Sequence, residues 1–158
     1  MILVTIGSQK FQFNRLLKRI DELIENKIIT DKVFAQIGSS DYKPKHYDYI
    51  DFMTQEEFNE KLDECDLLIT HAGTGVIVNA VKREKKVIAI PRLAKYGEHV
   101  DDHQIQLISQ FEELNFIEPC YELDELENKL EEIKNKKYNK YVSNTDTIIE
   151  SIKEFIDK

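Results

Sequence analysis

A glycine-rich turn, HAGTG at residues 71–75, follows an apolar run and opens into a segment with helical composition. Glycine permits a positive φ and a close backbone approach that a Cβ would block. The first N–H groups of a helix, together with the positive end of its dipole, favour a phosphate. The Thr74 hydroxyl adds a further donor. We therefore expect Gly73, Thr74 and Gly75 to bind the phosphates of a ligand.

A polar loop follows the next apolar run, residues 87–90, and leads into another helical pattern. This loop and the start of that helix carry five side chains that can form hydrogen bonds: Glu98, His99, Asp102, His103 and Gln104. Carboxylates and amides suit sugar hydroxyls, and imidazoles can transfer protons near neutral pH. We therefore expect this loop to bind a sugar.

Two histidines are candidates for the residue that transfers a proton, His71 and His99. His71 stands at the carboxyl end of an apolar run, where it could contact a phosphate or an acceptor, or bond only to local backbone.

Two alternatives remain open for the polar residues. Asp101 and Asp102 could simply cap the helix that follows them. His99 and His103 are four residues apart and, with His71, could ligate a divalent metal. The surroundings of a familiar zinc motif are missing, however, so we expect no metal.

A second turn of interest follows residues 2–6, an almost wholly apolar run typical of a central parallel strand. Gly7 and Ser8 break that run before a helical pattern that begins near Phe13. Backbone N–H groups at such a turn can also bind phosphate, or the turn can be purely structural. The GxGxxG fingerprint is absent, which argues against a dinucleotide site.

The remaining patterns alternate between strands and helices. Further strands are expected at residues 33–37, 49–53, 67–69, 87–90 and 116–117, and helices at 13–24, 54–64, after the 71–75 turn, at 102–114 and at 123–133. Thr54 and Glu57 have the spacing of a capping box. In the 102–114 helix we expect Ile105, Ile108 and Phe111 to face the core. This order predicts an α/β fold, a doubly wound, mostly parallel, Rossmann-like sheet.

Length and composition restrict the possible class of protein. At 158 residues the chain fits one domain, residues 1–158, and its net charge of −8 argues against a nucleic-acid partner. No apolar run is long enough to span a bilayer and no signal peptide is evident, so we expect a cytoplasmic protein. Cys65 and Cys120 lack the spacing of a metal site and are expected to be buried.

The last segment, residues 143–158, has a capping pattern and an apolar stripe of five side chains, Ile148, Ile149, Ile152, Phe155 and Ile156. We expect a terminal helix. Its stripe can pack on the domain's own sheet or dock on another chain.

Three motifs in this order resemble a known group of glycosyltransferases: residues 4–9 (VTIGSQ), 70–75 (THAGTG), and 96–104 (YGEHVDDHQ). The chain resembles the small single-domain subunits of two-component glycosyltransferases in capsule and exopolysaccharide synthesis. It is also similar to the catalytic subunit of the heterodimeric N-acetylglucosaminyltransferase of dolichol-linked oligosaccharide assembly. More distantly, it looks like the carboxyl-terminal half of the GT-B enzyme that adds N-acetylglucosamine to lipid I.

The resemblance implies a UDP-sugar donor, inversion at the anomeric carbon without a metal or other cofactor, and a lipid-linked saccharide acceptor. It also implies a membrane-anchored partner subunit that carries the acceptor half and recruits the chain to the inner face of the membrane. In the GT-B enzyme that acts on lipid I, a glutamate on the helix after the glycine turn holds the donor ribose. The matching residue here is Asn79. A non-catalytic nucleotide-binding regulatory subunit is the alternative function.

Overall fold

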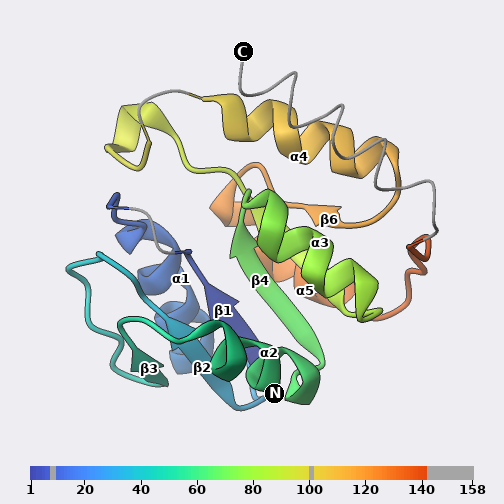
Figure 1. Cartoon of the computed structure of the whole chain (residues 1–158). Coiled ribbons are helices and arrows are strands. Elements are labelled where there is room, and N and C mark those ends of the chain that lie inside the picture. Colours follow the sequence, from blue (N-terminus) through green and yellow to red (C-terminus); the bar gives the residue numbers. More distant parts are fainter. Residues whose placement is uncertain (8–9, 100–101, 142–158) are drawn as a thin grey trace.

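The computed structural model describes residues 1–7, 10–99 and 102–141. In this part of the chain six strands form one sheet, and every strand pair is parallel. The sheet order is β3-β2-β1-β4-β5-β6 (Figure 1). The strands are β1 (Ile2–Thr5), β2 (Val33–Gln36), β3 (Asp48–Ile50), β4 (Leu67–His71), β5 (Lys86–Ile90) and β6 (Glu118–Pro119). The predicted doubly wound, Rossmann-like α/β fold is confirmed.

Helices cover both faces of this sheet. They are α1 (Asn14–Glu25), α2 (Gln55–Glu64), α3 (Thr74–Lys82), α4 (His103–Glu113) and α5 (Leu126–Glu132), with short 3₁₀ turns η1 (Ala94–Tyr96) and η2 (Leu123–Glu125). Side chains of α1 and α5 share one core cluster, and those of α2, α3 and α4 share the other. Successive strand residues point to opposite faces, so Val4 and Ile69 enter the first cluster while Leu3 and Leu68 enter the second.

Several local features follow directly from the sequence. Thr54 caps α2: its hydroxyl accepts from the Glu57 N–H at 3.1 Å, and the Glu57 carboxylate accepts from the Thr54 N–H at 3.4 Å. This is the predicted capping box. Cys65 and Cys120 are buried as expected.

Other details differ from the predictions. The sixth strand pairs at Glu118–Pro119, two residues later than expected, and β3 is a three-residue edge strand. Ile105 is 38% exposed rather than buried. The buried stripe of α4 is instead made by Gln104, Leu107, Ile108 and Phe111. Adjacent residues of a helix point about 100° apart. Because Gln104 faces the core, Ile105 points toward solvent.

Two predicted features lie outside the described residues, the terminal helix at 143–158 and Ser8. None of the helices that the structure describes is long and apolar enough to cross a membrane.

Candidate functional site

The two glycine turns lie side by side at the carboxyl ends of the central strands β1 and β4. β1 pairs with β4 in parallel register, from Ile2 opposite Leu67 to Thr5 opposite Thr70, so the segments that leave these strands are neighbours. The chain proceeds from β1 to β2 on one side, whereas β4 lies on the other side of β1 and leads to β5. Ligands of open α/β sheets bind at such a switch point, outside the carboxyl ends of the strands.

The imidazole of His71 fills the space between the two turns. A Cβ built on Gly7 would lie 2.6 Å from His71 Nε2, and one built on Gly73 would lie 2.7 Å from Cε1. Gly7 also has a φ of +76°, which side chains rarely adopt. Both glycines are therefore required by the packing of one histidine. This differs from the expected reason for Gly73, which was room for a phosphate.

Burial keeps His71 neutral. The side chain is 4% exposed, and desolvation, followed by the positive charge of Arg92 and then His99, lowers the pKa of His71 to about 3. Its Nδ1 atom is buried without a hydrogen-bond partner in the described structure. A histidine in this state favours a packing role over the proton transfer that the sequence suggested.

Gly75 differs from Gly73, because a Cβ built there would have no heavy atom within 4 Å. It stands in the first turn of α3, whose N-cap is Gly73 and whose first residue is Thr74. Figure 1 shows that the nine-residue helix α3 begins beside the carboxyl end of β4, at the switch point. The backbone at Thr74 and Gly75 is therefore open to an anionic ligand.

A cavity of about 290 Å³ adjoins this helix end. It connects the two turns with the start of α2, and its lining consists of Thr5, Gly7, Gln36, Met53, Thr54, Gln55, Phe58, Gly75, Val76 and Asn79. Asn79 reaches the cavity from α3, with its amide held by Asn59 and Arg83, each at 2.9 Å. The cavity offers both apolar walls and polar groups, as small-molecule sites do.

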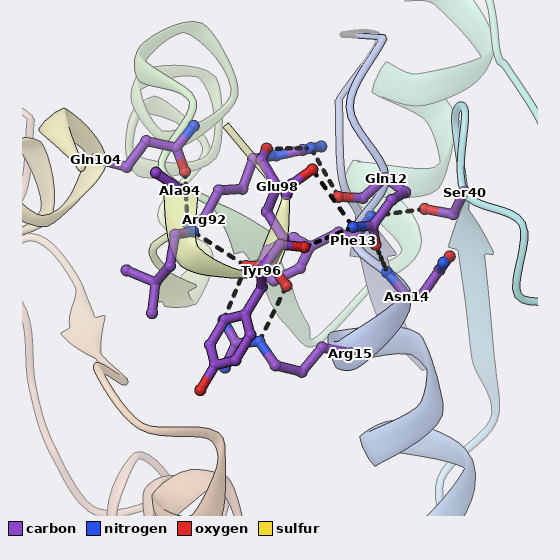
Figure 2. Close-up of polar contacts among 12 residues, drawn as sticks. Gln12, Phe13, Asn14, Arg15, Ser40, Arg92, Ala94, Tyr96, Glu98 and Gln104 are labelled. Carbon is purple, nitrogen blue, oxygen red and sulfur yellow. Dashed lines mark hydrogen bonds and ion pairs between the residues drawn. The ribbon is translucent and has the colours of Figure 1, made fainter. Parts of the chain in front are cut away.

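Glu98 does not lie free at the site. Its side chain is 1% exposed, and both carboxylate oxygens accept from Arg15, each at 3.0 Å. The Leu93 N–H donates to the same carboxylate at 3.0 Å. Figure 2 shows this carboxylate between α1 and the segment after β5. The contacts assign Glu98 to fixing the loop, in place of the predicted contact with sugar.

The other loop residues divide between anchoring and exposure. Gln104 is buried, and its Oε1 accepts from the Arg92 N–H at 2.8 Å and the Ala72 N–H at 3.4 Å. Asp102 occupies the N-cap position of α4, but its side chain accepts from the Ala94 N–H at 2.9 Å rather than capping the helix.

The two loop histidines lie nearer the surface. His103 is exposed at the start of α4, and the ring of half-buried His99 lies 5.6 Å from that of Phe11. In the described residues no three His, Cys, Asp or Glu side chains gather as metal ligands would.

Arg92 was not predicted from the sequence. It follows β5 directly after Pro91 and is fully buried, with its guanidinium donating to Phe11 O at 2.8 Å, Glu98 O at 3.3 Å, Gln12 O at 3.4 Å and Ile6 O. It joins the segment after β1 to the segment after β5. The only signal in the sequence is a charged residue two positions after the end of a buried strand.

The contrast between the two glycines predicts opposite effects on stability. Gly73→Ala forces its Cβ into the His71 ring and should lower the free energy of unfolding by about 1–3 kcal/mol, as overpacking does. Gly75→Ala adds a side chain in open space within a helix and should leave stability unchanged or raise it by up to about 1 kcal/mol. Urea denaturation measures both. Equal losses in the two variants would contradict the assignment of His71 as the reason for Gly73.

The low pKa of His71 predicts a pH effect on stability. The unfolded chain binds a proton below about pH 6.5 and the folded chain only near about pH 3, so this group's stabilisation is complete above 6.5 and is lost as pH falls. The free energy of unfolding of the wild type should therefore decline more steeply from about pH 6.5 to about pH 4 than that of His71→Gln. Parallel pH profiles would mean that His71 is not buried in the neutral form.

Comparison with known proteins agrees with this geometry. The sequence matches the glycosyltransferase family 28 C-terminal domain over residues 1–158. It is 27% identical to the Candida albicans UDP-N-acetylglucosamine transferase subunit ALG13 over 110 residues, which cover 68% of this chain and 35% of that protein. The chain thus spans about a third of the length of this relative.

Solved structures give the same fold. The solution structure of ALG13 superposes with a TM-score of 0.63 at 20% identity, covering 99% of this chain and 96% of the other. MurG of Acinetobacter baumannii superposes with a TM-score of 0.60 at 16% identity, covering 97% of this chain and 49% of MurG. The sheet has the fold of the C-terminal domain of GT-B enzymes. By its sequence match over the whole chain, the protein belongs to the glycosyltransferase family 28 C-terminal domain family.

Proposed function

We propose that this chain is the donor-binding and catalytic subunit of an inverting, UDP-sugar-dependent hexosyltransferase. One observation carries the proposal: the glycine turns after β1 and β4, the open N-terminus of α3 and an adjoining cavity all meet at the switch point of the sheet. A helix N-terminus suits a diphosphate, and the cavity beside it suits a nucleoside.

The donor is oriented by the position of these groups. The diphosphate lies against the backbone of Gly7, Thr74 and Gly75, and the ribose faces the cavity wall that contains Asn79. The hexose, galactose or an N-acetylglucosamine-like sugar, extends toward the start of α4, where His103 is exposed.

Transfer is a displacement at C1 of the hexose. The acceptor hydroxyl forms the new glycosidic bond while the C1–O bond to UDP breaks, and the acceptor proton passes to a base. Negative charge then develops on the diphosphate, where preorganised N–H groups and the α3 dipole stabilise it. Since His71 is neutral with a pKa of about 3, it is a poor base. His99 or a partner residue remains for that role.

The acceptor half of the enzyme is assigned to a partner. The relative in Candida albicans is named a subunit, which supports a partner for this chain. A membrane-anchored partner would contribute the acceptor-binding half, hold a lipid-linked saccharide and recruit this chain to the cytoplasmic face of the membrane. The product would serve exopolysaccharide or capsule synthesis.

A non-catalytic nucleotide-binding subunit is the second candidate. It is favoured by the burial of two predicted site residues, His71 and Glu98, in packing and ion-pair contacts. Transfer of labelled hexose by membranes that contain the partner, dependent on this chain, separates the two functions.

Nucleotide binding tests the proposal. Calorimetry should show that UDP binds more tightly than ADP or GDP, because the proposed donor is a UDP-sugar. Gly75→Ala should fold normally and lose about tenfold or more in UDP affinity, since its Cβ stands where the diphosphate approaches. Lys82→Ala, at the far end of α3, is the matched control and should bind like the wild type. Equal affinity for the three nucleotides, or no binding of any, would contradict the proposal.

A further inference from the structure

Two arginines and one glutamate form a cluster beneath the site, which we name the Arg15–Glu98–Arg92 cluster. Glu98 receives both of its charged contacts from Arg15, at 3.0 Å each. Arg92 donates instead to four main-chain carbonyl oxygens, those of Ile6, Phe11, Gln12 and Glu98. Figure 2 shows the three side chains converging between α1 and the segment after β5.

The cluster holds one more positive charge than negative. Glu98 is the only carboxylate in contact with either arginine among the described residues, and its oxygens bind Arg15 rather than Arg92. Burial lowers the pKa of Arg92 to about 10, which still leaves the guanidinium protonated at neutral pH. Carbonyl oxygens accept from its terminal N–H groups but cannot cancel its charge, and its buried Nε–H has no hydrogen-bond partner in the described residues. A buried positive charge therefore persists in a chain whose net charge is −8.

This charge lies close to both glycine turns. Ile6, which accepts from the Arg92 guanidinium, directly precedes Gly7. The Arg92 N–H and the Ala72 N–H share the Oε1 atom of Gln104, so the same residue is tied to the turn after β4. The positive charge of Arg92 also lowers the pKa of His71, which lies between the two turns. In a buried setting such a charge acts at longer range than in water and is screened little by salt.

We propose that Arg92 is an electrostatic positioning residue: its buried positive charge favours a diphosphate at the two glycine turns without contacting it. The inference rests on the proposed function and deepens it by naming what, besides N–H groups, selects an anion. By binding carbonyls on the segment after β1, the same guanidinium fixes the Gly7 turn in the shape that receives the ligand.

A purely structural role is the competing explanation, and a variant that keeps the charge separates the two. If Arg92 only shapes the turns, Arg92→Lys weakens UDP as much as Arg92→Met does, because one ammonium group cannot replace the contacts of the guanidinium with four carbonyl oxygens. If its charge matters, the loss falls on UDP, which carries the diphosphate, and spares uridine, which carries none. The informative quantity is the ratio of the two affinities.

The experiment measures UDP and uridine affinities by NMR titration of the full chain. Arg92→Met should lower UDP affinity by about tenfold and uridine affinity by less than about twofold. Arg92→Lys keeps the charge and should retain most of the UDP preference. Arg92→Gln removes the charge but keeps an amide donor for the carbonyl oxygens, so it carries the test if Arg92→Met does not fold. It should reduce the UDP preference in the same direction.

The outcomes distinguish the inference from the function it rests on. A wild-type chain that binds neither ligand overturns the proposed function. If the wild-type chain prefers UDP, the inference alone is overturned when Arg92→Met, or Arg92→Gln in its place, weakens UDP and uridine by the same factor or leaves both unchanged. A preference lost in Arg92→Lys as fully as in Arg92→Met also overturns it, because the charge is then irrelevant.

Discussion

The parallel pairing of β1 with β4 is the constraint on which the candidate site depends. Strands that are adjacent in the sheet but separated by some sixty residues end side by side, so two turns that are remote in sequence become one surface. Because the sheet order changes direction at this point, the chain leaves β1 toward β2 on one side and leaves β4 toward β5 on the other. The N-terminus of α3 is left open there, and the cavity next to it is bounded by segments from β1, α2 and α3.

Buried polar groups at the carboxyl ends of β1, β4 and β5 hold these turns in place. The His71 ring fits only because Gly7 and Gly73 lack side chains. Arg92 draws the segment after β1 toward the segment after β5 through main-chain carbonyls, and Glu98 ties that second segment to α1 through Arg15. A buried charge is costly unless it is well bonded, so removal of one of these partners should destabilise the fold. The site residues that remain open, Thr74 and Gly75, are therefore presented on a fixed frame.

The sequence predicted the features that depend on local periodicity and spacing. Short apolar runs between helical patterns indicated the strands. The positions of Thr54 and Glu57 indicated a capping box that the structure contains. The turn at 71–75 was located correctly at the carboxyl end of a parallel strand. Periodicity was less reliable where a polar side chain is buried: Gln104 faces inward in α4, and Ile105 was wrongly expected in its place.

Contacts between distant segments could not be predicted in this way. Nothing in the residues around Glu98 shows that its carboxylate is taken by Arg15, 83 residues away, or that Arg92 reaches Ile6 across 86 residues. The type of a residue indicated which chemistry it can perform, but its partners decide whether it is available. For that reason the sequence assigned His71 to proton transfer and Glu98 to sugar binding. In the structure His71 packs against two glycines and Glu98 is ion-paired with Arg15.

The claim that a nucleoside diphosphate binds at the switch point is tested most directly by mapping the site in solution. Amide chemical shifts of the isotope-labelled chain would be followed while UDP is added. The account predicts that the largest shift changes fall on Gly7, Thr74 and Gly75 and on the cavity residues Asn79 and Gln55, with little change at the opposite end of the sheet. Shift changes concentrated elsewhere, for example around Lys27 and Asp66 at the amino ends of the strands, would contradict it.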